Sequence, residues 1–72
     1  MAINGVMLGV VINNMDPMGK GRAMVQLPSL GTSNWALVCQ GPGSGRVGVG
    51  EKVVVAFENG DPGRPVVLGR VP

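Results

Sequence analysis

Four carboxylates are the side chains of this sequence that could do acid–base chemistry: Asp16, Glu51, Glu58 and Asp61. Paired carboxylates serve as general acid and base when they are positioned beside a substrate. Asp16 and Asp61 each precede a proline, however, and Asp in that context commonly organises a turn through its side chain. Glu51 and Glu58 lie at the two ends of an apolar run and are expected to be solvated. We therefore predict that none of the four is catalytic and that the chain is not an enzyme.

Cys39 is the only cysteine, and the sequence contains no histidine. Catalysis by a thiol needs a base such as His, and a structural zinc site needs four Cys or His ligands. Neither is available, and a disulfide within the chain is impossible. Cys39 lies in the apolar run 35–39, so we expect an inert, buried thiol, with an intermolecular disulfide or a reactive site as alternatives. No metal or cofactor is expected.

Two features could bind nucleotides or nucleic acid: the glycine-rich segment 41–46 and Trp35. The segment lacks the Gly-Lys-Ser/Thr ending of a P-loop and no helix follows it, so it is interpreted as a structural loop. Base stacking requires several aromatic residues and a basic groove, whereas Phe57 is the only other aromatic residue and falls on an expected core face. The six basic residues are scattered along the chain: Lys20, Arg22, Arg46, Lys52, Arg64 and Arg70. A packing or interface role for Trp35 is favoured. A nucleic-acid-binding module is the first alternative function, and a fragment of an enzyme, such as the collar of a cell-wall hydrolase, is the second.

Short strands must position these side chains. Five runs of apolar and alternating residues are predicted as strands: residues 6–12, 22–27, 35–40, 52–58 and about 65–71. Asn59 and Gly60 supply the positive φ angles of a hairpin turn between the last two runs, and Pro62 and Pro65 stiffen its exit. No window has a helical period. We predict an all-β fold, a small five-stranded Greek-key OB barrel, with an SH3-like barrel as the rival.

The connection between the third and fourth strands often carries a helix in OB folds. In this chain residues 41–45 of that connection are rich in glycine, which disfavours a helix. The helix is therefore expected to be absent.

A chain of 72 residues forms one domain, residues 1–72, and buries too little apolar area to be more than marginally stable alone. Because disulfides and a zinc site are excluded, association between copies is the remaining common source of stability. The sequence contains no run of about 18 apolar residues and no signal peptide at its start. We expect it to be made in a cytoplasm and kept or assembled there.

Two of the predicted strands are apolar on both faces. Residues 6, 8, 10 and 12 alternate with an equally apolar set at 7, 9 and 11, and Val54 and Ala56 alternate with Val53, Val55 and Phe57. A lone barrel needs one apolar face per strand, so the second face is expected to be covered by another subunit. The predicted interface residues are those on the outward faces together with Trp35: Met7, Val11, Trp35, Val54 and Ala56.

Four segments carry a resemblance to a known family. Residues 10–17 end in an Asn-x-Asp-Pro pattern, residues 19–28 read Gly-Lys-Gly-Arg-Ala-Met-Val-Gln-Leu-Pro, and residues 35–38 read Trp-Ala-Leu-Val. Residues 49–69 contain Val-Gly-Glu-Lys-Val and then Phe-Glu-Asn-Gly-Asp-Pro-Gly-Arg-Pro. Together they resemble the VgrG-type OB domain of phage baseplate hub and spike proteins, such as baseplate assembly protein V, and of type VI secretion spikes. The resemblance covers nearly the whole chain.

The resemblance implies a homotrimer that forms a collar or disc in the central spike or hub of a contractile tail, between the tube end and the piercing tip. It also implies a virion structural protein that is assembled in the bacterial cytoplasm, contacts other baseplate or spike proteins, and meets a membrane only at injection. Neither nucleic acid nor a cofactor is implied as a partner. The residues expected to shape the loops that dock on neighbouring proteins are Asp16, Pro17, Gly60, Asp61, Pro62, Arg64 and Pro65.

The chain departs from the family pattern in three respects. Family proteins usually continue into a β-helical needle or a lysozyme domain, or begin with tube-like hub domains, and none of these is present. The connection at 41–45 is shortened, and Gly48 stands where the family has proline. We therefore expect a standalone OB module whose needle and tip come from other chains. The start at Met1 and the stop at Pro72 favour a compact gene product, and a truncated piece is the alternative.

Overall fold

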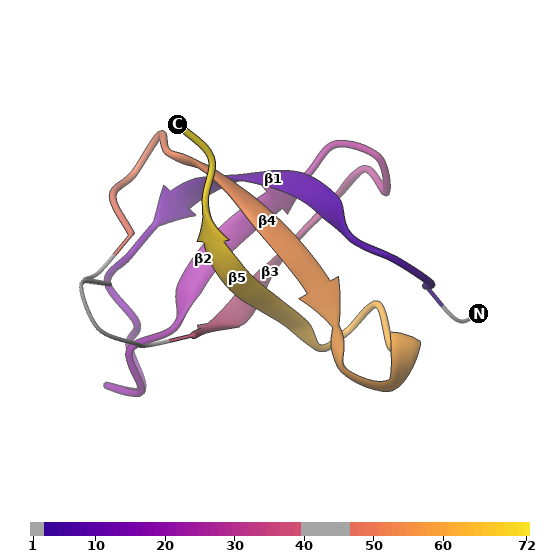
Figure 1. Cartoon of the computed structure of the whole chain (residues 1–72). Coiled ribbons are helices and arrows are strands. Elements are labelled where there is room, and N and C mark those ends of the chain that lie inside the picture. Colours follow the sequence, from indigo (N-terminus) through magenta and orange to yellow (C-terminus); the bar gives the residue numbers. More distant parts are fainter. Residues whose placement is uncertain (1–2, 40–46) are drawn as a thin grey trace.

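The fold is a closed barrel of short strands. A computed structural model describes residues 3–39 and 47–72 (Figure 1). Within these ranges the strands are β1 (Met7–Asn13), β2 (Ala23–Leu27), β3 (Thr32–Val38), β4 (Lys52–Phe57) and β5 (Pro65–Arg70). Their order around the barrel is β1-β2-β3-β5-β4. Figure 1 shows β4 and β5, in orange and yellow, crossing in front of β2 and β3.

The pairing of the strands confirms the predicted OB topology. β1 pairs antiparallel with β4 through its first half and with β2 through its second half, with a register shift between Val11 and Asn13. β2–β3 and β4–β5 are also antiparallel, whereas β3 and β5 run parallel. One strand that pairs with two neighbours and one parallel closing pair make the five-stranded Greek-key barrel.

The third strand begins earlier than predicted, at Thr32 instead of residue 35. A tight turn places Thr32 opposite Leu27, with the N–H groups of Leu30 and Gly31 donating to the Leu27 carbonyl at 3.0 and 2.9 Å. Gly31 has a φ of 69°, which glycine adopts without strain. The polar composition of 29–34 is typical of a loop, but this turn is so short that residues 32–34 pair with β2.

The interior of the barrel is apolar throughout the part of the chain that the structure describes, and it contains no buried polar side chain there. As predicted, β2 and β4 bury alternate residues. The buried hydrophobic residues are Val11, Ala23, Val25, Leu27, Ala36, Val47, Val53, Val55, Phe57 and Val67. Close packing of branched side chains in so small a barrel leaves no room for a polar group without a partner.

The two faces of β1 are the reverse of the prediction. Val11 is fully buried and Met7 is half-buried against the core, whereas Leu8 is 56% exposed. The expectation that Met7 and Val11 lie on the outward face was therefore wrong. Both faces of β1 are apolar, so alternation alone cannot choose between them. Gly9 marks the inward face of β1, because the packing there leaves no room for a side chain. An added Cβ would lie 3.1 Å from the Gln26 carbonyl oxygen and 3.3 Å from the Leu27 and Val55 side chains.

The turn between β4 and β5 has the predicted chemistry. A single 3₁₀ turn, η1 (Glu58–Gly60), follows β4, and within it Asn59 and Gly60 have φ angles of 53° and 72°. The Asp61 side chain accepts a hydrogen bond from the Gly63 N–H at 2.9 Å. The Glu58 N–H donates to the Arg64 carbonyl at 3.0 Å and closes the turn.

The expectation that Cys39 is buried was also wrong. Its thiol is exposed, not buried. Its N–H continues the pairing with β5 by donating to the Val67 carbonyl at 2.9 Å. Its side chain lies on the same outward side as that of Leu37, two residues earlier, and both residues are exposed. The glycine-rich connection at 41–45, where a helix was expected to be absent, lies outside the described residues. Within 3–39 and 47–72, no helix has the length and apolar character to cross a membrane.

Candidate interaction surfaces

An apolar surface extends over the outside of four adjacent strands, β1, β4, β5 and β3. Val54 and Ala56 lie on the outward side of β4, as predicted, and are half-buried by their neighbours. The strand register places Leu8 beside Val54, and it places Val66 between Ala56 and Leu37. Leu68 is the extra residue at the β4–β5 bulge and is exposed. We call this surface the outer face: Leu8, Leu37, Val54, Ala56, Val66 and Leu68.

The outer face differs from the scattered apolar residues that any protein surface displays. Leu8 and Leu37 are 56% and 52% exposed, and they are joined across β4 and β5 by cross-strand neighbours that are all aliphatic. Contiguous exposed apolar patches on a folded domain commonly mark interaction sites. The outer face is therefore a candidate interface, and Val54 and Ala56 lie within it.

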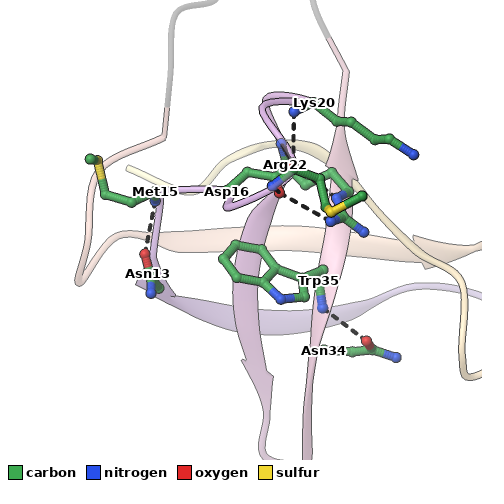
Figure 2. A network of polar contacts seen from close by, with 8 residues as sticks. Asn13, Met15, Asp16, Lys20, Arg22, Asn34 and Trp35 are labelled. Carbon is green, nitrogen blue, oxygen red and sulfur yellow. Dashed lines mark hydrogen bonds and ion pairs between the residues drawn. The ribbon is translucent and has the colours of Figure 1, made fainter.

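The second candidate surface is the β1–β2 loop, residues 14–22, which Asp16 organises. The Asp16 side chain is only 3% exposed. Its two oxygens accept hydrogen bonds from the N–H groups of Met18, Lys20 and Arg22 at 2.8–3.2 Å. They also accept from Nε and Nη2 of Arg22 at 2.9 and 3.0 Å, the paired geometry of a guanidinium on a carboxylate (Figure 2). The Asp-Pro turn predicted from sequence is thus the centre of the loop.

The ionisation of this pair follows from its contacts. The Arg22 side chain is the largest cause that lowers the pKa of Asp16 well below its ordinary value, while burial opposes the shift and the backbone N–H donors reinforce it. Asp16 in turn raises the pKa of Arg22. A carboxylate this firmly ionised is a poor general base near neutral pH. The arrangement therefore suits a structural role.

Arg22 connects the loop to the barrel wall. Its Cζ lies 5.6 Å from the centroid of the Trp35 ring, within the range of a cation–π contact. Figure 2 shows the indole below the Asp16–Arg22 pair, on the outward side of β3. The backbone N–H of Trp35 donates a hydrogen bond to the side-chain oxygen of Asn34 at 2.9 Å. Asp16 and Trp35, which were singled out separately from sequence, thus belong to one cluster, and Arg22 is the residue that joins them.

The loop displays apolar side chains at its end. Met15 and Met18 are 71% and 66% exposed, and Pro17 is exposed between them. The Met15 N–H donates to the Asn13 side chain at 2.8 Å, and the Gly19 N–H donates to the Asp16 carbonyl at 3.0 Å. We call Met15, Pro17 and Met18 the loop tip. Its backbone is held by hydrogen bonds while its side chains face solvent.

A cleft of about 230 Å³ lies between the Trp35 cluster and the β4–β5 turn. Arg64 is exposed at its rim, with ion-pair distances of 3.6 Å to both Glu58 and Asp61. Exposed pairs of this kind contribute little stability. The structure thus brings Arg64 and Pro65 close to Trp35, as the lining of one cleft. The lining residues are Arg22, Trp35, Leu37, Glu58, Gly63, Arg64 and Pro65.

Residues 7–71 match the family described as the Type VI secretion system/phage-baseplate injector OB domain. The chain belongs to this family. No curated protein matches the chain. The match extends from the first residue of β1 to the residue that follows β5, so it includes both candidate surfaces. The resemblance seen in the sequence motifs is confirmed, and it indicates that this injector OB domain is a structural part of a phage baseplate or injection particle that associates with other baseplate or spike proteins.

Sequence reasoning missed four of the six residues of the outer face. Leu8 was missed because β1 was predicted to face the other way, and Leu37, Val66 and Leu68 were missed because β3 and β5 were not divided into faces. Arg22 was counted as a scattered charge, although it follows Asp16 by six residues across a Gly-rich loop. In residues 3–39 and 47–72, no three His, Cys, Asp or Glu side chains gather as metal ligands would.

Proposed function

We propose that three copies of the chain associate into a ring that serves as a collar or disc in the central spike or hub of a contractile tail. In this position the ring joins the tube end to the piercing tip and carries out no catalysis. It would be assembled in the bacterial cytoplasm and carried in the finished particle. Membership of the injector OB family supports the location in a baseplate.

The outer face is the observation that carries the trimer. Every strand of the closed barrel pairs with two neighbours, and the outer face lies over strands that are paired side by side. Copies that meet at the outer face therefore meet through side chains. The outer face offers six aliphatic residues on adjacent strands, in a chain too small to be more than marginally stable by itself.

The exposed turns suit contacts with the proteins stacked above and below the ring. The loop around Asp16 and Pro17 and the turn from Gly60 to Arg64 each have a backbone fixed by internal hydrogen bonds. Fixed loops lose little conformational entropy when they bind, which favours docking on a neighbouring protein. Pro65 is fully buried and acts by holding the start of β5 instead.

Light scattering in solution tests the trimer. The expected mass is three times the 7.4 kDa of the protomer, and it should persist at high micromolar concentration. Val54→Lys, which buries a charge in the proposed interface, should yield monomers. Gln26→Lys adds the same charge to an exposed position of β2, outside the outer face, and should leave the trimer intact. A monomeric wild-type protein at that concentration would refute the proposal.

A further inference from the structure

A three-fold ring places a specific demand on each copy. In a two-fold dimer the same surface meets itself, but in a ring of three each copy contacts its two neighbours through two different surfaces. The outer face supplies one of them. We propose that the loop tip supplies the other, so that the loop tip of one copy docks on the outer face of the next. This inference rests on the proposed trimer and names the surfaces that build it.

The loop tip has the properties of a docking element. Met15 and Met18 are the two most exposed large hydrophobic residues in the described part of the chain. Methionine is flexible and polarisable and adapts its shape to an apolar partner surface. The backbone beneath these residues is fixed by the hydrogen bonds to Asp16, so docking orders side chains only. Figure 2 shows the Met15 side chain directed away from the Asp16–Arg22 pair.

The loop tip and the outer face lie on different parts of the molecule. Figure 1 shows the β1–β2 loop projecting beyond the barrel at the lower left, whereas β4, the centre of the outer face, crosses the barrel in front. Arg22 fixes the base of the loop over Trp35 on β3, beside Leu37 at the edge of the outer face. The loop tip and the outer-face residues Leu8 and Leu37 are all exposed, so one copy does not cover its own outer face with its own loop tip.

Charge supports a second copy as the occupant. Lys20 follows the loop tip, and its side chain extends into solvent (Figure 2). The outer face ends at Ala56, and the carboxylates of Glu58 and Asp61 lie just beyond it. These two carboxylates share one cation, Arg64, at 3.6 Å, which leaves this rim with a net negative charge. A loop tip docked near Ala56 would bring Lys20 to that rim.

The cleft beside the outer face provides room for the contact. It has a volume of about 230 Å³, and Leu37 of the outer face is part of its lining together with Pro65 and Glu58. The lining also includes the charged side chains of Arg22 and Arg64. The outer face and the cleft thus adjoin at Leu37 and form one receptor for the loop tip, apolar over the strands and charged at its rim.

Complementation between two variants tests the arrangement. Met15→Asp with Met18→Asp removes the loop tip, and Leu37→Lys disables the outer face; each protein alone should be monomeric by light scattering, with a wild-type circular dichroism spectrum. Mixed at high micromolar concentration, they should form a dimer of one copy of each, because one intact loop tip still meets one intact outer face. A different affinity tag on each variant identifies the mixed pair.

Three results would overturn the inference. A loop-tip variant that stays trimeric would show that the ring forms without the loop tip, and would leave the proposed trimer standing. Two monomeric variants that fail to combine would show that the two surfaces do not meet. If either variant fails to fold, Lys20→Glu replaces it. We expect Lys20→Glu to raise the dissociation constant of the trimer at least tenfold, and we expect the addition of Glu58→Lys to restore the wild-type value. No recovery would also refute the arrangement, whereas a monomeric wild type would refute the trimer itself.

Discussion

Replacing two adjacent valines of β1 by threonine gives the sharpest test of the barrel interior. Val10 and Val11 are neighbours of the same type in the same strand, but Val11 is fully buried and Val10 is only half-buried on the outward side. Threonine has nearly the shape of valine and differs by a hydroxyl in place of a methyl group. A comparison of Val11→Thr with Val10→Thr therefore isolates the effect of burial on stability, because the change in side-chain shape and the strand are the same.

The magnitude follows from the surroundings of each side chain. At Val11 the new hydroxyl would lie among aliphatic core residues and would lack a partner, which costs about 1–3 kcal/mol. Loss of the buried methyl group adds about 0.8 kcal/mol. The expected loss in unfolding free energy is therefore about 2–4 kcal/mol for Val11→Thr. At Val10 the hydroxyl reaches water, and the loss should stay within about 0.5 kcal/mol.

Urea unfolding followed by the fluorescence of Trp35, the single tryptophan, measures both losses. With a slope of about 1 kcal/mol per molar for a small domain, the urea midpoint of Val11→Thr should fall by about 2–4 M. Both variants and the wild type must be compared at one protomer concentration, because association adds to the apparent stability. A larger loss for Val10→Thr than for Val11→Thr would mean that β1 faces the other way and would refute the core described above.

Three further predictions concern the loop and the glycines. Acidification should lower the melting temperature of the wild type more than that of Asp16→Asn: the pKa of Asp16 is depressed on folding, so its stabilisation is complete above the ordinary value of 3.8 and is lost as pH falls below it. Gly9→Ala should cost about 1 kcal/mol in urea unfolding because its Cβ meets backbone at 3.1 Å, whereas Gly69→Ala in β5 meets nothing within 4 Å and should be neutral or slightly stabilising. Arg22→Lys, which loses the paired hydrogen bonds to Asp16, should speed amide exchange in the β1–β2 loop while leaving exchange of core amides unchanged.

The hairpin between β4 and β5 shows why much of the fold could be predicted. Asn59 and Gly60 have left-handed φ angles because their residue types tolerate them. In β4 the buried residues at 53, 55 and 57 alternate with the half-buried Val54 and Ala56. Local chemistry of this kind acts over a few residues, so it can be read without knowing the partner strands. The Asp16-Pro17 turn is local in the same sense.

The errors arose where the deciding contacts are distant in sequence. Val11 is buried because β1 packs its Gly9 backbone against Leu27 and Val55, and no pattern within β1 expresses those contacts. Cys39 is exposed because the pairing with β5 sets its parity after β3 has ended. Short-range alternation identifies that a strand has two faces, but the strands on either side determine which face is buried.

The sequence by itself determined the turn between β4 and β5, the strand count and the family, because residue types and their spacing carry that information directly. Only the tertiary structure decided which residues form the outer face and that Asp16, Arg22 and Trp35 make one cluster. The physical reason is that exposure is a property of the closed barrel. Leu8, Val54, Val66 and Leu37 become one surface only when strand pairing sets them side by side.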